Sequence, residues 1–236
     1  MNTYRSYICY IGLYVFLISS YDLNDGEQNM IVSELVPYDK KRTKVYIDGE
    51  YAFMLYKGEI RDQKIKVNEE ITDETYDYIM NTVLSKRCKL RAMNLLQKKD
   101  YTEYKLREKL RDGQYPAAII DIAVDYVKSY KYVDDERYAR DYIKYYMDLR
   151  SKKRIMQDLT GKGIDKTLLN TVIEELYEEA DPDIELDQAI KLLKKKNYDK
   201  STADMACKQK LMGFLFRKGF SMDVIRKALA LDTDYE

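Results

Sequence analysis

The stretch Leu159-Thr-Gly-Lys-Gly-Ile-Asp-Lys-Thr-Leu-Leu169 decides the fold, because the chain repeats its pattern on either side. The pattern is an apolar residue, a leucine four positions on, a basic or glycine-containing turn, a bulky apolar residue, and two adjacent aliphatic residues. Its copies are Leu106, Leu110, Tyr115, Ile119 and Ile120; Ile155, Leu159, Ile164, Leu168 and Leu169; and Leu211, Leu215, Phe220, Val224 and Ile225. The leucines are spaced 49 and then 56 residues apart, which predicts one supersecondary unit copied in tandem.

Helix start and stop signals divide each copy into three helices. In the first copy, Thr102 predicts a helix N-cap and Pro116 a new helix start. In the second, Asp134-Asp135 predicts a cap, and Gly161-Lys-Gly163 a helix C-terminus in preference to a phosphate-binding loop. In the third, a polar stretch over 194–202 separates the first two helices and accounts for the longer spacing.

The segment before the repeats, residues 31–67, has a β-like pattern. Asp48-Gly49 lies between two runs rich in β-branched and aromatic residues, which predicts a hairpin with a type I′ turn. Pro37 precedes a polar turn, and Thr72 before two acidic residues predicts the start of a helix.

The sequence therefore predicts a mainly α protein: an elongated array of three tandem three-helix repeats, preceded by a small N-terminal region containing a β-hairpin. Short helices are marginal alone, so we expect each copy to form a miniature core and the stacked copies to extend it. The expected divisions are an upstream extension (1–29), the hairpin and helix region (30–88), and repeats over 89–133, 134–180 and 184–232.

Charge is abundant but balanced, with 41 basic and 41 acidic residues, so net charge does not indicate a nucleic-acid partner. The sign of the charge alternates along the chain. Residues 86–115 hold ten bases and four acids, residues 167–187 eight acids and no base, and residues 188–227 eleven bases and three acids. This alternation suits a protein that lies along a charged partner, and it is equally typical of the solvated faces of charged helices.

Residues needed for common catalytic and metal sites are missing. The chain has no His, and its three cysteines are isolated, which argues against zinc spacing and a disulfide framework and favours a reducing, cytoplasmic location. We expect Cys88 and Cys207 to be small packing residues. Asp134 and Asp135 are better explained as a helix cap than as catalytic or metal-binding acids. We therefore predict no enzyme, no cofactor and no metal.

Residues 1–29 contain an apolar run over 8–18 that is too short to span a bilayer comfortably and lacks a small-residue cleavage site. Three explanations stay open: translation that begins at Met30, a loosely packed extension, or a secretory signal. The missing disulfide framework weakens the last.

Several segments resemble a known family, the RecX regulatory proteins. The segment Val133-Asp-Asp-Glu-Arg-Tyr-Ala-Arg140, together with Arg150 and Leu159-Thr-Gly-Lys-Gly-Ile164, is similar to the central motif of that family. Residues 92–110 are similar to its opening repeat, and residues 45–53 to the hairpin extension of longer members. The resemblance covers about 30–231 and departs at Gln114, where the other two repeats carry Gly163 and Gly219.

The resemblance implies a function that composition does not show. RecX proteins bind the RecA recombinase, chiefly as its filament on single-stranded DNA, and modulate, usually inhibit, its ATPase, strand-exchange and co-protease activities. We therefore expect a cytoplasmic, monomeric regulator of RecA in DNA repair, recombination and the SOS response, without a membrane partner. The alternative is a non-specific DNA-binding helical module that acts on recombination indirectly.

The candidate contact residues for RecA or DNA are basic, because Lys and Arg bind phosphates and acidic surfaces. They are Lys98, Lys99, Arg107 and Arg111 in repeat one; Arg150, Lys152, Lys153 and Arg154 in repeat two; and Lys194, Lys195, Lys196, Arg217 and Lys218 in repeat three. The cluster over 150–154 is the strongest candidate, since four bases lie within five residues and Arg150 matches the family motif.

Overall fold

The computed structural model describes residues 30–230, so the expectations for 1–29 and for the end of repeat three lie outside the described residues. The chain divides into two compact units, the first ending at Asp77 and the second starting at Tyr78. Among the described residues, no helix combines the length and the apolar character that crossing a membrane requires.

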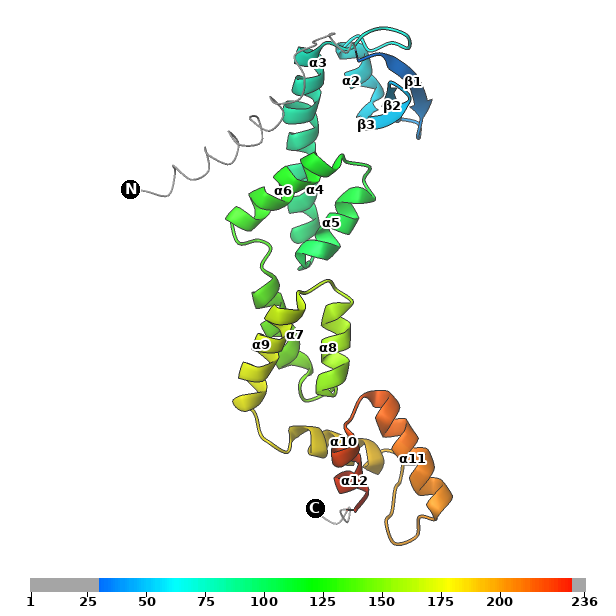
Figure 1. The fold of residues 1–236 in the computed structure, drawn as a ribbon, viewed down its shortest axis with the longest axis vertical. Coiled ribbons are helices and arrows are strands. Elements are labelled where there is room, and N and C mark those ends of the chain that lie inside the picture. Colours follow the sequence, from blue (N-terminus) through cyan, green and yellow to red (C-terminus); the bar gives the residue numbers. More distant parts are fainter. Residues whose placement is uncertain (1–29, 231–236) are drawn as a thin grey trace, which may run out of the picture. The chain divides into compact units, whose positions relative to one another are not determined.

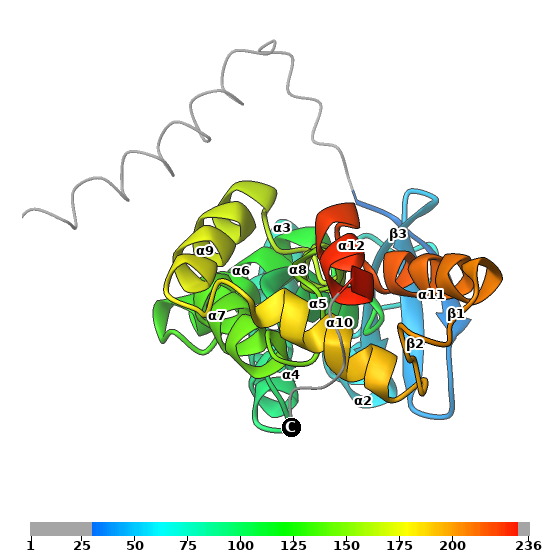
Figure 2. The same cartoon turned by 90° about the horizontal axis from the view of Figure 1, so that it is seen from below.

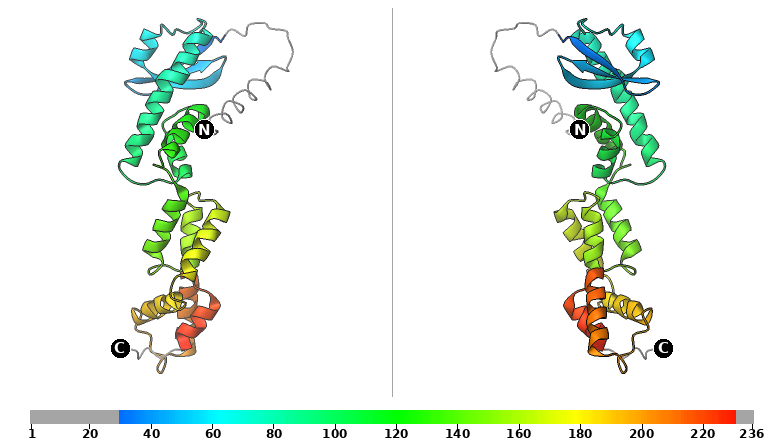
Figure 3. Two further views of the ribbon diagram at one scale, coloured as in Figure 1. Left: turned by 90° about the vertical axis from the view of Figure 1, so that its left-hand side faces the viewer. Right: turned by 90° about the vertical axis from the view of Figure 1, so that its right-hand side faces the viewer.

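The first unit contains a three-stranded antiparallel sheet in the order β1-β2-β3 (Figure 3). Its strands are β1 (Val32–Pro37), β2 (Arg42–Ile47) and β3 (Glu50–Tyr56). Asp48 and Gly49 join β2 to β3 with φ angles of 50° and 88°. Positive φ at both turn residues is what a type I′ turn requires, so the predicted hairpin is confirmed.

A short helix interrupts the stretch that we expected to be β-like. Helix α2 (Lys57–Asp62) follows β3 directly, and the Glu59 carboxylate accepts a hydrogen bond from the Tyr56 N–H at 2.7 Å. This bond pairs an N–H group at the start of the helix, which favours a helix over a continued strand. The helix predicted after Thr72 is present as α3 (Asp73–Asp77), and Thr72 Oγ1 accepts from the Thr75 N–H.

The second unit begins with a π-helix, η1 (Tyr78–Leu84), where the sequence predicted an ordinary α-helical face. Its i→i+5 bonding widens the turn, so residues five apart lie on the same side. Ile79 and Leu84 have this spacing, and both are buried. The apolar face predicted from the sequence is therefore kept in a wider helix.

The rest of the second unit consists of three-helix repeats, as predicted (Figure 1). Repeat one is α4 (Ser85–Leu96), α5 (Glu103–Arg111) and α6 (Ala117–Ser129); repeat two is α7 (Asp135–Tyr146), α8 (Lys152–Thr160) and α9 (Lys166–Glu178); repeat three is α10 (Ile184–Lys194), α11 (Met205–Lys218) and α12 (Met222–Ala230). In each repeat the first helix packs on the third, as α10 and α12 do in Figure 2.

The repeated apolar positions form the cores. Leu106, Leu110, Ile155, Leu159 and Leu215 are fully buried. Of the adjacent aliphatic pairs, both members are buried in repeat one, but only the second member in repeats two and three. Repeats two and three have separate apolar clusters, so our expectation that stacking extends a single core is wrong at this junction. The contacts between repeats two and three include hydrogen bonds and the approach of Lys153 to the Phe216 ring.

The residue four positions after the repeat leucine has a left-handed backbone conformation in every repeat. Its φ is 61° at Gln114, 82° at Gly163 and 96° at Gly219. Each N–H donates to the carbonyl oxygen three residues earlier, at 2.8 to 2.9 Å. The turn is therefore the same in all three repeats, although repeat one builds it with Gln in place of Gly.

Two expectations about single residues need correction or extension. Cys88 is buried, and burial raises the pKa of its thiol to about 12, but Cys207 is exposed and is not a packing residue. Cys207 stands in the first turn of α11, where its N–H donates to the Asp204 cap and its side chain faces solvent.

The polar stretch after α10 also contains a core residue: Tyr198 is buried, and its hydroxyl donates to the Leu229 carbonyl at 2.8 Å.

Candidate interaction surface

The basic cluster of repeat two surrounds the start of α8. Arg150 Nη1 lies 2.6 Å from Asp158 Oδ2, and its guanidinium lies 3.9 Å from the centre of the Tyr146 ring. Arg154 pairs with the same Asp158 at 3.2 Å. Lys152 and Lys153 lie over aromatic rings, of Tyr177 and Phe216 respectively. One carboxylate thus holds both arginines, which fixes their position and lowers their net charge.

Part of this cluster meets cations of repeat three in a groove of about 480 Å³, which we call the basic groove. The groove is lined by Leu149, Arg150, Ser151, Arg154, Leu192, Phe214, Arg217, Lys218 and Phe220. Arg217 and Lys218 end α11, are exposed, and form no ion pair among the described residues. Four of the predicted contact residues, from two repeats, are therefore brought together, which their separation in sequence did not show.

The other candidates lie outside this groove. Lys98 and Lys99 are exposed in the turn after α4, and Arg111 is exposed in the last turn of α5. Lys194, Lys195 and Lys196 are exposed at the end of α10. Arg107 is held by two carboxylates, Glu103 at 2.8 Å and Asp121. A partner's anion would have to displace those carboxylates, which makes Arg107 the weakest of the candidates.

The same pair of hydrogen bonds joins consecutive repeats, and we call each pair a junction clasp. In the first bond, the N-cap hydroxyl of a repeat's second helix donates to a carbonyl of the next repeat. Thr102 Oγ1 donates to the Lys162 carbonyl at 2.6 Å, and Ser151 Oγ donates to the Lys218 carbonyl at 2.8 Å. Each acceptor directly precedes the left-handed glycine of its repeat, so the two bonds are equivalent.

In the second bond, the first N–H of that same helix donates to a carboxylate of the next repeat. The Glu103 N–H donates to Asp135 at 2.8 Å, and the Lys152 N–H donates to Glu185 at 2.8 Å. Burial raises the pKa of Asp135, and the nearby negative charge of Glu103 adds to this rise, although the bond from the Glu103 N–H opposes it. The first N–H of a helix has no partner within that helix, and in each clasp a carboxylate of the following repeat accepts its hydrogen bond.

The clasps explain why Gln114 departs from the family pattern. A Cβ at Gly163 would overlap Tyr104 Cβ and Cγ of repeat one, and a Cβ at Gly219 would lie 2.5 Å from Ser151 Oγ of repeat two. Glycine is thus required at these positions for close approach as well as for φ. Repeat one is the first of the series, so its turn meets no preceding clasp and a side chain fits.

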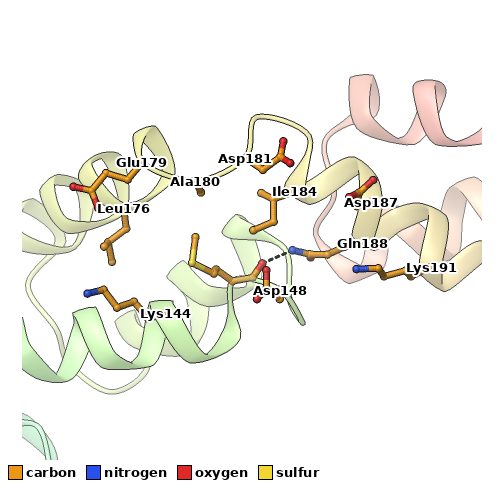
Figure 4. A pocket seen from close by; sticks show the side chains of 11 residues that line it. Lys144, Asp148, Leu176, Glu179, Ala180, Asp181, Ile184, Asp187, Gln188 and Lys191 are labelled. Atoms are coloured by element: carbon orange, nitrogen blue, oxygen red, sulfur yellow. Dashed lines mark hydrogen bonds between the residues drawn. The ribbon is translucent and has the colours of Figure 1, made fainter.

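Sequence reasoning missed the clasp residues Ser151 and Glu185, and also Gln188. Gln188 lies on α10, is buried, and donates through Nε2 to the Met147 carbonyl of repeat two (Figure 4). A serine before a basic helix start signals an N-cap, which was available from the pattern. The contacts that these residues make with other repeats have no counterpart in local sequence.

Comparison with known proteins shows which proteins are similar to this chain over most of its length. The chain is 33% identical over 204 residues to the regulatory protein RecX of Caldanaerobacter subterraneus subsp. tengcongensis, covering 86% of this chain and all of that relative. This chain belongs to the RecX family. A RecX of Clostridium beijerinckii is 30% identical over 85% of this chain and 96% of its own length. The RecX first three-helix domain matches residues 88–126, and the RecX third three-helix domain matches residues 183–229.

Solved RecX structures share the fold. A crystal structure of regulatory protein RecX aligns over 84% of this chain and 98% of its own, with a TM-score of 0.57 at 21% identity. The crystal structure of RecX from Lactobacillus salivarius aligns over 62% of this chain and 95% of its own, with a TM-score of 0.55 at 22% identity. RecX is a family of regulatory proteins, which agrees with the regulatory role that the resemblance implied.

Proposed function

We propose that this chain binds the RecA recombinase, as its filament on single-stranded DNA, and inhibits the ATPase, strand-exchange and co-protease activities of that filament. We propose further that it acts in the cytoplasm, as a monomer and without catalytic activity of its own. Membership of the RecX family of regulatory proteins is the observation that carries this proposal.

The basic groove supports a charged partner. Arg and Lys neutralise backbone phosphates and acidic protein surfaces, and an arginine can hold either anion through two parallel hydrogen bonds. In the groove, Arg217 and Lys218 are exposed and have no carboxylate partner within residues 30–230, while Asp158 holds Arg150 and Arg154 in place. We therefore assign the first contact with an anion to Arg217 and Lys218, and a supporting role to the two paired arginines.

The test is the RecA ATPase on single-stranded DNA, titrated with wild type and with an Arg217→Glu/Lys218→Glu variant. The matched control is Arg226→Glu/Lys227→Glu, which reverses an identical, exposed Arg-Lys pair on α12 of the same repeat, outside the groove. We expect the groove variant to inhibit at least about tenfold less well and the control to inhibit like wild type, with equal thermal melts. Equal inhibition by both variants would remove the groove from the proposal, and no inhibition by wild type would remove the proposal itself.

The same titration separates modes of action. Inhibition well below one copy per RecA indicates capping of filament ends, and inhibition only near saturation indicates coating of the filament. Binding to bare single-stranded DNA provides the test of the alternative function. Salt-dependent affinity that is equal with and without RecA would favour a non-specific DNA-binding module.

A further inference from the structure

The sheet of the first unit has two chemically different faces. Along β2, buried residues alternate with partly exposed ones, so one face is covered and the other is partly exposed. Tyrosine rings and cations lie together on the partly exposed side. We call this set the aromatic face, and its members are Tyr38, Arg42, Lys44, Tyr46 and Tyr51. An antiparallel sheet usually presents polar residues on its solvated face, so a concentration of rings there needs an explanation.

The rings and cations of the aromatic face form one continuous strip. Lys44 Nζ lies 5.4 Å from the centre of the Tyr38 ring and 5.7 Å from the centre of the Tyr51 ring, so it links the two. Arg42 Cζ lies 4.9 Å from the centre of the Tyr38 ring. At the other end, the rings of Tyr46 and Tyr51 meet edge to face, with their centres 5.9 Å apart. Each member of the strip therefore touches the next one.

A β-bulge turns Tyr51 toward this strip. Val45 of β2 pairs with Phe53, and the next residue, Tyr46, pairs with Tyr51. Ala52 is therefore left without a partner on β2. Without this extra residue, Tyr51 would share a face with Phe53, because side chains two apart on a strand point the same way. With it, Phe53 is fully buried, whereas Tyr51 is 37% exposed. Bulges re-aim side chains next to functional sites, and this one adds a ring to the aromatic face.

The surroundings of the aromatic face are basic. Residues 34–46 hold four bases and two acids. Asp39 pairs with Arg42 at 2.7 Å, and the other acid, Glu34, lies on β1 opposite a ring of the strip. Lys40 and Lys41 lie in the turn between β1 and β2, are exposed, and form no ion pair within residues 30–230. The strip therefore keeps uncompensated positive charge at the end where β1 turns into β2.

The combination of rings and cations fits a ligand that has flat rings and negative charge together. Aromatic side chains stack on nucleobases with little regard to sequence, while Lys and Arg contact the phosphates between them. An acidic protein surface would use the cations but not the rings, and an apolar protein surface would use the rings but leave the cations unpaired. Single-stranded nucleic acid uses both, because its bases are free to leave their own stack.

We propose that the aromatic face binds single-stranded nucleic acid. In this arrangement, bases stack on Tyr38 and Tyr51, the most exposed rings of the strip, and Lys40, Lys41 and Lys44 contact the phosphates. The site belongs to the first unit, whereas the basic groove belongs to the second. Its binding to a bare strand needs no RecA, so this proposal and the proposed function can fail independently.

The test is the fluorescence anisotropy of a short labelled oligothymidylate, titrated with the full chain in the absence of RecA. Tyr38→Ala/Tyr51→Ala removes two rings, and Tyr38→Phe/Tyr51→Phe keeps them. We expect the alanine variant to bind at least about tenfold more weakly than wild type, and the phenylalanine variant to bind like wild type, because stacking needs only the ring. The position control Tyr130→Ala/Tyr145→Ala removes two exposed rings of repeats one and two and should also bind like wild type. Equal affinity of wild type and Tyr38→Ala/Tyr51→Ala would overturn the proposal.

Two measurements on wild type alone keep the test valid if the alanine variant folds poorly. An abasic strand of the same length has the phosphates without the bases, and we expect it to bind at least about fivefold more weakly than oligothymidylate. A strand that carries 5-iodouracil should form its photocrosslink, located by mass spectrometry, within residues 38–51. Equal binding of the abasic strand, or crosslinks confined to the three-helix repeats, would contradict base stacking on this face.

The salt dependence of binding tests the contacts with phosphate. Each phosphate contact with a single strand contributes about 0.7 to the slope of log affinity against log salt concentration, so Lys40→Gln/Lys41→Gln should reduce that slope by about 1.4. The control Lys64→Gln/Lys66→Gln removes two exposed lysines of the same unit outside the aromatic face and should leave the slope unchanged. An unchanged slope in both variants would remove the turn lysines from the site.

Competition identifies the class of ligand. Polyglutamate at the same concentration of charge should displace the labelled strand poorly, because it has no rings to stack. Displacement as strong as that by unlabelled oligothymidylate would mean that the face binds acidic protein surfaces, and the assignment to nucleic acid would be wrong. Oligouridylate, titrated in parallel, shows whether RNA or DNA is the preferred strand, and tight binding of either one agrees with the proposal.

Discussion

The junction between repeats one and two and the junction between repeats two and three share one clasp but differ in their surroundings. Both clasps use an N-cap hydroxyl and the first N–H of a second helix. At the first junction, the side chain of Tyr104 fills the space beside Gly163. At the second, the Ser151 hydroxyl lies against Gly219, with the Arg154 backbone N and Lys153 Cβ next to it, and the basic groove lies nearby.

This difference separates the requirements of folding from those of binding. The clasp follows from the repeat itself, because every second helix begins with unpaired N–H groups that a neighbour can satisfy. The basic groove lies at the second junction, where Arg150, Arg154 and Arg217 line it beside the clasp residues Ser151 and Lys218. We therefore expect changes at the first junction to alter stability, and changes around the second to alter binding as well.

The largest effect should come from Leu159→Ala, in the core of repeat two between the two junctions. Leu159 is fully buried, and removing its side chain should lower the free energy of unfolding by about 2–5 kcal/mol. A urea melt measures the loss, and hydrogen exchange should show lost protection in α7, α8 and α9 first. An unchanged urea midpoint would contradict the assignment of Leu159 to the core.

A smaller effect, unequal between the junctions, should follow from Gly163→Ala and Gly219→Ala. Both place a Cβ at a left-handed residue, which costs about 1–2 kcal/mol. Gly163→Ala should cost more, because its Cβ would overlap three Tyr104 atoms close to the backbone, whereas a Cβ at Gly219 would displace one hydroxyl and so lose the clasp bond to the Lys218 carbonyl. Gln114→Ala is the control and should change stability by less than about 0.5 kcal/mol. Equal losses at the two glycines would remove this distinction between the junctions.

A third comparison isolates the hydroxyl bond of the clasp. Ser151→Ala removes both a helix cap and the bond to the Lys218 carbonyl, while Ser221→Ala removes a cap to the Val224 N–H alone. Capping is worth about 0.5–2 kcal/mol, and we expect Ser151→Ala to cost about 1 kcal/mol more than Ser221→Ala. Chemical denaturation of the two variants measures the excess, and equal costs would mean that the clasp bond adds no net stability.

The smallest effect concerns pH at the first junction. Because the pKa of Asp135 is raised, the folded state holds its proton more tightly than the unfolded chain does. Its contribution to stability is therefore most favourable at pH values below the unfolded pKa and is lost as pH rises through the folded pKa. Relative to Asp135→Asn, wild type should gain stability as the solution is acidified. Urea midpoints of the two proteins, measured side by side against pH, would show this gain, and a constant difference between them would contradict it.

Local patterns in the sequence predicted most of the helix boundaries and core positions. Thr102, Asp134 and Leu159 are examples, since caps and helical periodicity depend on neighbouring residues. The same reasoning missed α2, whose start depends on one carboxylate reaching back to Tyr56. It also missed the buried Tyr198, because a single core residue in a polar stretch has no periodicity to mark it.

The candidate surface could be predicted only in part. Composition identified the basic residues, but the meeting of Arg150 and Arg154 with Arg217 and Lys218 depends on how repeats two and three pack. Likewise, Gln188 is an ordinary polar residue in the sequence, whereas its bond to the Met147 carbonyl of repeat two is visible only in the folded chain. Properties that arise between repeats require the tertiary structure.

The left-handed turn position has a use beyond this molecule. In this chain the position is glycine in repeats two and three, where the preceding repeat lies against the turn. It is Gln114 in repeat one, which follows no other three-helix repeat. A residue with a side chain at this position would then mark the first repeat of a series, and a glycine would mark an internal one. Such a marker would allow the repeats of a related protein to be counted and ordered from its amino-acid sequence alone.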